Sequence, residues 1–81
     1  MSRTSANTLQ YYDHAVVDMM VEKYGLEFED ALRRFVTSET HSMLEDTEYG
    51  LLSFGPGGIF DIWEAEVVTG DPKNSIYIRG E

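Results

Sequence analysis

The sequence predicts a mainly α-helical fold: a compact single domain of four helices, with a short C-terminal strand or an extended tail. Three observations support this fold class. Apolar residues recur at helical spacing in four segments, glycines separate those segments, and only the last stretch alternates in the manner of a strand. A chain of 81 residues is short enough for one domain, so we expect residues 1–81 to form a single unit. An α+β fold with a two-stranded element is the alternative.

An apolar stripe predicts the first helix, over residues 8–24; its main members are Leu9, Tyr12, Val16 and Met19. Asn7, with a Gln three residues later, is the expected N-terminal cap of this helix. Gly25 supplies the left-handed backbone position at which the helix would end. Residues 1–7 precede the periodic pattern, and we expect them to be disordered.

Two further helices are expected over residues 28–37 and 39–47. The apolar residues of the first are spaced as on a core-facing helix: Phe28, Ala31, Leu32, Phe35 and Val36. Ser38 is a favourable N-cap for the second, and Gly50 follows its expected end. The short gap after Gly25 makes the first two helices an antiparallel hairpin.

A fourth helix is expected over residues 57–69, with Pro56 suited to its first turn and a Gly-Asp-Pro sequence after it. Residues 51–54 are too few for a helix, so we expect an extended stretch or an apolar loop laid over the core. Residues 75–79 alternate polar and apolar side chains and include β-branched ones, which is a strand pattern. This strand would pair with residues 51–54, pair with another chain, or lie over the helices.

The charge of the chain excludes several classes of function. Its 15 Asp and Glu outnumber 6 Lys and Arg, giving a formal net charge of −9. Such an excess disfavours binding to nucleic acid phosphates and to anionic membranes. No apolar run approaches the roughly 20 residues that cross a bilayer, and the first ten residues lack the apolar core of a signal peptide, so we expect a cytoplasmic protein. The absence of Cys rules out disulfides and thiolate metal sites.

The acids concentrate in one half of the chain. Residues 35–72 contain eight Asp and Glu and no Lys or Arg, and three of those acids, Asp61, Glu64 and Glu66, surround Trp63. A surface of one sign attracts and selects partners of the opposite charge. We therefore expect an interaction site for a basic protein at these four residues. Core packing is the leading interpretation of Trp63 itself; an exposed Trp63 framed by acids would instead be an interface contact.

The C-terminal strand offers a second contact surface. Tyr77 and Arg79 flank Ile78, and both residue types are enriched in interfaces. An unpaired strand edge is also a template for pairing with another chain. Because a core of this size supplies little stability alone, we expect homodimerisation through the first helix or this strand.

The two histidines are the remaining candidates for chemistry. His14 and Asp18 are four residues apart on the first helix and are weak candidates for metal ligands, but a zinc or iron site needs at least three protein ligands. A weak contact on an exposed helix face is the favoured interpretation of this pair. His41 lies beside two serines without a nucleophile motif, so a partly buried or capping histidine is favoured there. We expect no cofactor and no catalytic residue.

Four segments resemble a family of short bacterial helical proteins that form a domain of unknown function: Glu22–Phe35, Leu44–Asp46, Gly50–Leu51 and Ile62–Glu66. The similarity rests on turn glycines and core aromatics and spans roughly residues 10 to 70. It implies a helical fold and transfers no functional residue. Some such small proteins look like members of toxin–antitoxin-like pairs, which implies a role in neutralising another protein.

Two functional hypotheses follow. The leading one is a small acidic, non-enzymatic interaction or regulatory module that docks on a basic protein partner, with an antitoxin-like inhibitor as one form. The alternative is a small metal- or ligand-binding enzyme that uses His14 with Asp18, or His41.

Overall fold

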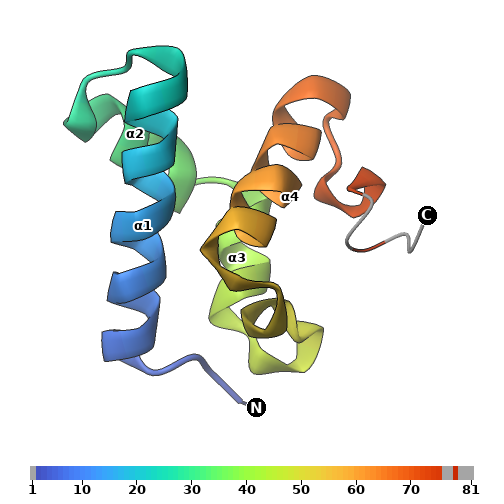
Figure 1. Ribbon diagram of the computed structural model, residues 1–81. Helices are drawn as coiled ribbons and strands as arrows, with labels where there is room; N and C mark the ends of the chain where they lie inside the picture. Colours follow the sequence, from blue (N-terminus) through green and yellow to red (C-terminus); the bar gives the residue numbers. More distant parts are fainter. Residues whose placement is uncertain (1, 76–77, 79–81) are drawn as a thin grey trace.

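The structure is mainly α-helical, as predicted, with four α-helices in its described part (Figure 1). The computed structural model describes residues 2–75 and residue 78. The helices are α1 (Ala6–Tyr24), α2 (Phe28–Val36), α3 (Glu39–Glu45) and α4 (Gly55–Thr69). The 3₁₀ turns are η1 (Thr47–Tyr49), η2 (Leu51–Phe54) and η3 (Pro72–Asn74). No β-strand occurs among the described residues.

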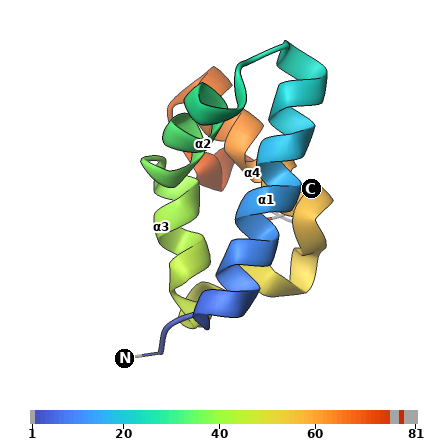
Figure 2. The ribbon, with the colours of Figure 1, turned by 90° about the vertical axis from the view of Figure 1, so that its left-hand side faces the viewer.

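Helix α4 is the element against which most of the others pack. It contacts α1, α3, η2 and η3, whereas α2 turns back along α1 and reaches α3. Figures 1 and 2 show α1 beside α4, with α2 folded against the C-terminal end of α1. All four helices and η2 contribute buried apolar residues to one core: Val16, Val17, Met20, Ala31, Phe35, Met43, Leu44, Leu51, Ile59, Ile62 and Trp63.

The buried face of α1 is rotated slightly from the predicted stripe. Val16, Val17 and Met20 are completely buried, while Tyr12 and Met19 are only half-buried. The reason is that α1 packs against two elements, α2 and α4, so the side chains that point between them are enclosed. Tyr12 and Met19 are left at the border of the α1–α4 contact, where they remain partly accessible.

Three predicted helix boundaries are confirmed by backbone geometry and capping. Gly25 and Gly70 adopt left-handed conformations, with φ of 65° and 82°, at the ends of α1 and α4. The Ser38 side chain accepts the backbone N–H of His41 at the start of α3. Helix α3 ends at Glu45, two residues before the predicted end, because Asp46 is extended.

The predicted disorder of the N-terminal residues is wrong for those that the structure describes. Thr4 Oγ1 donates a hydrogen bond to the carbonyl of Leu44 at 2.6 Å, and the N–H of Thr4 donates to the carbonyl of Glu45 at 2.8 Å. Helix α1 also begins earlier than predicted, and its N-cap is Ser5, not Asn7. The last turn of α3 leaves carbonyls without helical partners, and the N-terminal segment satisfies two of them.

The predicted extended stretch at residues 51–54 is a 3₁₀ turn, so the two-stranded alternative is wrong for this segment. Of the predicted strand at residues 75–79, the structure describes Ser75 and Ile78, and the other three residues lie outside the described part. The N–H of Ile78 donates to the carbonyl of Ser75 at 3.1 Å, a contact of turn type, and Ile78 packs against the core.

Two glycine substitutions should change stability in opposite directions. Gly25→Ala should lower the free energy of unfolding by about 1–2 kcal/mol, because an L-residue is strained at positive φ. Gly57→Ala, inside the first turn of α4, should raise it by about 0.4–1 kcal/mol by restricting the unfolded chain. An added Cβ meets nothing within 4 Å at either site, so backbone conformation alone separates them. Urea denaturation measures both, and equal effects would contradict the backbone explanation.

Candidate functional site

Trp63 lies in the core, and only 5% of it is exposed. Its ring stacks on Phe60 with 6.1 Å between centroids and meets Tyr24 edge-on at the same separation. Trp63 therefore anchors α4 against the end of α1. The three acids around it in sequence, and not the indole, come to the surface of the molecule.

Glu64 connects α4 to the last turn of α1. Its carboxylate accepts a hydrogen bond from Lys23 Nζ at 2.6 Å and another from the Tyr24 hydroxyl. The Lys23 ammonium also lies 5.6 Å from the ring centroids of Tyr24 and Phe60, within the range of a cation–π contact. Burial opposes ionisation of Glu64, but the two donors outweigh it, so the pKa of this carboxyl is lowered from its ordinary value.

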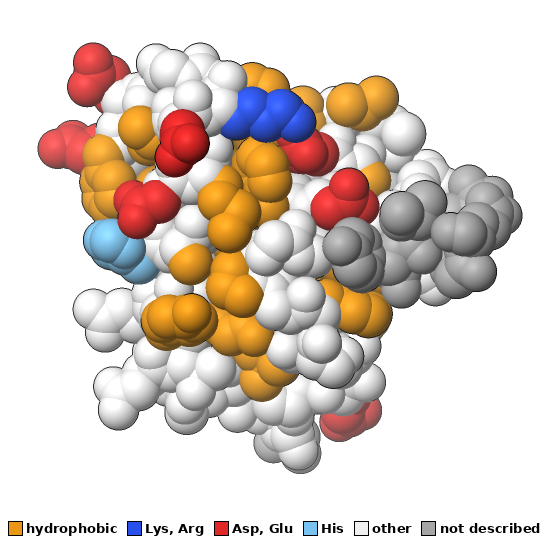
Figure 3. Space-filling model, in the orientation of Figure 1, with side chains coloured by type: hydrophobic (Ala, Val, Ile, Leu, Met, Phe, Trp, Pro, Cys, Tyr) orange, Lys and Arg blue, Asp and Glu red, His pale blue; other side chains and the backbone are white. Residues whose placement is uncertain are grey.

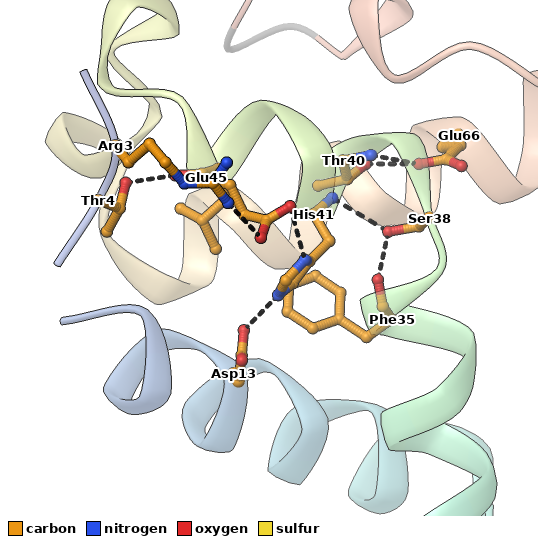
Figure 4. Close-up of polar contacts among 10 residues, drawn as sticks. Arg3, Thr4, Asp13, Phe35, Ser38, Thr40, His41, Glu45 and Glu66 are labelled. Atoms are coloured by element: carbon orange, nitrogen blue, oxygen red, sulfur yellow. Dashed lines mark hydrogen bonds and ion pairs between the residues drawn. The ribbon is translucent and has the colours of Figure 1, made fainter. Parts of the chain in front are cut away.

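Glu66 connects α4 to the start of α3. Its two carboxylate oxygens accept the backbone N–H groups of Glu39 and Thr40, at 3.0 and 2.8 Å, and the Thr40 hydroxyl at 2.7 Å. Figure 4 shows the contacts with Thr40. Free N–H groups at a helix N-terminus favour a negative charge. A seven-residue helix is not stable by itself, so α3 depends on this contact and on its Ser38 cap.

Asp61 holds the segment that follows η3. Its carboxylate accepts a hydrogen bond from the Ser75 hydroxyl at 2.8 Å. Each of the three acids predicted as contact residues thus makes an intramolecular contact with a different element. Tyr77 and Arg79, the other predicted contact residues, lie outside the described residues, and their role stays a prediction.

His41 joins α3 to α1 through a buried polar contact that sequence patterns did not indicate. Its Nε2 lies 2.8 Å from Asp13 Oδ1, and its Nδ1 lies 3.8 Å from Glu45 Oε1 (Figure 4). The imidazole also meets the Phe35 ring edge-on. Burial raises the pKa of the Asp13 carboxyl, and the neighbouring His41 offsets only part of that effect. His41 is thus buried, more completely than the partly buried or capping histidine that the sequence favoured.

The first candidate pair for metal binding lies on the surface. His14 Nδ1 is 3.3 Å from Asp18 Oδ2, and both side chains are more than half exposed. This geometry matches the predicted weak contact on a helix face. Across residues 2–75 and residue 78, no group of three or more His, Asp or Glu side chains is placed to hold a metal ion.

The carboxylates that stay free are not those that the sequence singled out. Within the described chain, five exposed Glu side chains form neither a hydrogen bond nor an ion pair: Glu22, Glu27, Glu29, Glu39 and Glu48. The first three of them lie at the α1–α2 connection, and we call them the acidic turn. The acids of residues 35–72 mostly serve as caps and inter-helix contacts; Asp46 and Asp71, for example, accept N–H groups of η1 and η3. The structure thus moves the accessible negative charge toward the first half of the chain.

Figure 3 shows a band of hydrophobic side chains that runs along the face formed by α1 and α4. Contacts among its members connect the two helices and η2; for example, the Tyr12 hydroxyl donates to the carbonyl of Leu52. We use the name apolar band for six accessible or half-accessible side chains of α1, η2 and α4: Tyr11, Tyr12, Met19, Tyr24, Leu52 and Phe60. Tyr11 is the most exposed of them, at 63%.

An open groove of about 480 Å³ lies beside one end of the apolar band. Lys23 and Tyr24 of α1 line one side of it, and Asp61, Glu64 and Val68 of α4 line another. Val68 is 82% exposed, an unusual position for a large apolar residue on a core helix. The groove therefore combines apolar surface with two carboxylates.

No protein-family model matches this chain, and no curated protein or solved structure resembles it significantly. The resemblance to short bacterial helical proteins accordingly stays a prediction. The functional argument rests on the site itself, which joins exposed carboxylates to an accessible apolar surface.

Removing the charge of Glu66 should destabilise the protein. Glu66→Gln should lower the free energy of unfolding by about 1–3 kcal/mol. The reason is that the donors at the start of α3 bind both carboxylate oxygens of Glu66, whereas an amide has only one acceptor oxygen. Glu48→Gln, on an exposed side chain without a partner, should change it by less than about 0.5 kcal/mol. Urea denaturation compares the two, and equal effects would show that the α3 cap is unimportant.

Stability should respond to pH in opposite ways at Asp13 and Glu64. Because the pKa of Asp13 is raised, this residue contributes most to the free energy of unfolding below about pH 4. The difference in the free energy of unfolding between the unmodified protein and Asp13→Asn should therefore shrink as pH rises through that pKa. Because the pKa of Glu64 is lowered, this residue contributes to the free energy of unfolding above about pH 4. The difference in the free energy of unfolding between the unmodified protein and Glu64→Gln should therefore shrink as pH falls through that pKa. Denaturation of the three proteins from pH 3 to 7 tests this, and differences of the same slope would contradict it.

Proposed function

We propose that this protein is a small, non-enzymatic interaction module that binds a basic protein partner through the acidic turn and the neighbouring apolar band. The observation that carries the proposal is the set of exposed carboxylates without an intramolecular partner. Charges that are not used in the fold remain available to attract a partner of opposite sign. Accessible aromatic side chains beside them supply the apolar contact area on which binding energy depends.

A protein is a better partner for this surface than a nucleic acid or a membrane. A net charge of −9 repels phosphates and anionic lipids, whereas it accelerates encounter with a basic protein. None of the described helices combines the length and apolar character needed to span a bilayer. We further propose that the module acts in the cytoplasm.

Regulation of the bound partner is the simplest role for a module of this size. Covering the basic surface of a partner would block whatever that surface binds, and antitoxin-like neutralisation is one form of such a role. Homodimerisation stays a separate prediction. Light scattering during size exclusion tests it, and a 9.2 kDa species at high concentration would count against it.

Affinity purification from the source organism tests the proposed function. The tagged full-length chain should retain a basic protein and release it as salt rises, because surface electrostatic contacts are screened within about 10 Å at 0.1 M salt. Purification of the partner then allows its dissociation constant to be measured.

Two double variants with the same change of charge provide the control. Glu22→Gln with Glu27→Gln should weaken binding of the purified partner by about 3- to 10-fold. Glu39→Gln with Glu48→Gln, away from the acidic turn, should leave it within about 2-fold. Capture that is absent, or that ignores salt and these variants, would refute the proposed function.

A further inference from the structure

We propose that the partner segment recognised by this protein is an amphipathic α-helix, with Lys or Arg on both sides of its apolar stripe, that lies along the apolar band between α1 and α4. This inference rests on the proposed function and names the chemistry of its partner. It is carried by the arrangement of charge around the apolar band, by a contact that Lys23 already makes there, and by the shape of the face.

Carboxylates lie on both sides of the apolar band. Asp18 and Glu22 belong to the solvent side of α1, and Asp61 and Glu64 belong to α4; Figure 3 shows acidic side chains to either side of the hydrophobic ones. Lys23 is the only Lys or Arg in α1 and α4 together, against six acids. A helix that placed apolar residues on the band would therefore bring its two flanks against negative charge.

Lys23 demonstrates the chemistry that this face accepts. Its ammonium lies over the rings of Tyr24 and Phe60 and contacts the Glu64 carboxylate. An aromatic face beside a carboxylate attracts a cation both through the ring and through the opposite charge. Glu22, an exposed carboxylate of α1 without an intramolecular partner, is available to pair with a cation that comes from a partner.

A helix fits this face better than an extended segment. The described residues expose no strand edge to which an extended peptide could add, and an apolar surface between two helices suits the apolar stripe of an amphipathic helix. Helix α1 has 19 residues and is about 28 Å long, which matches a partner helix of about 18 residues.

A second copy of this chain is a poorer occupant. Its own apolar band is bordered by carboxylates, so two copies would bring like charges together across the interface. Like charges placed opposite each other oppose association in protein interfaces and select against wrong partners. Charge complementarity consequently favours a basic helix from another protein.

The test uses three labelled synthetic peptides of about 18 residues and fluorescence anisotropy with the full-length chain. The first is built from Leu and Lys, with Leu at helical i, i+3, i+4 and i+7 spacing. The second has the same composition in an order without an apolar stripe, and the third replaces Lys by Glu. We expect the first to bind at least about 10-fold more tightly than either control, with amide NMR shifts concentrated in α1 and α4.

Matched variants locate the site. Tyr11→Ala with Met19→Ala removes apolar surface from the band and should weaken binding of the first peptide by about 10-fold. Tyr49→Ala with Val36→Ala removes exposed side chains elsewhere and should leave binding within about 2-fold. All variants are first checked for native helicity by circular dichroism, because only folded proteins enter the comparison.

Three outcomes would overturn the inference. Equal binding of the striped and shuffled peptides would mean that charge alone suffices, and equal loss in the two double variants would place the contact elsewhere. A dimer whose NMR shifts map to the apolar band would make a second copy its occupant. Each of these results would refute the basic helix as the partner segment. The proposed function is tested separately, by the salt-dependent capture of a basic protein.

Discussion

The packing of α4 against α1, α3 and the 3₁₀ turns is the constraint on which the rest of the structure depends. Ile59, Ile62 and Trp63 supply the buried side of this helix. Three carboxylates leave its other sides and reach three different elements. Asp61 contacts the segment after η3, Glu64 contacts α1, and Glu66 caps α3. A small core gains stability from such contacts because they join elements that are far apart in the sequence, and the contact of Glu66 also satisfies N–H groups at the start of α3.

This use of carboxylates divides the acidic residues into two groups. Those of α4 and of the caps are engaged within the fold, whereas the acidic turn faces solvent without a partner. The negative charge that residues 35–72 can offer to a partner is therefore smaller than their count of Asp and Glu suggests. A partner would meet unengaged negative charge chiefly at the α1–α2 connection and beside the apolar band on α1, and this location is the basis for proposing a basic helix as the partner.

Contacts between distant parts of the chain account for the features that sequence patterns missed. The Asp13–His41 and Lys23–Glu64 pairs span 28 and 41 residues, and the hydrogen bond from Thr4 to Leu44 spans 40. No local motif marks either partner of such a pair. The order of the N-terminal segment and the burial of His41 follow from these contacts, so neither could be derived from the spacing of neighbouring residues.

The sequence by itself determined the fold class, the four helices and most of their ends. Apolar periodicity and the glycines at positions 25 and 70 act within a few residues, so they are visible without tertiary structure. The tertiary structure decided that Trp63 is buried, that residues 51–54 form a turn, and which acids remain free. These properties depend on which helix faces meet. A helix that packs against two neighbours at once, as α1 does, encloses side chains at the edge of the apolar stripe that its own sequence shows.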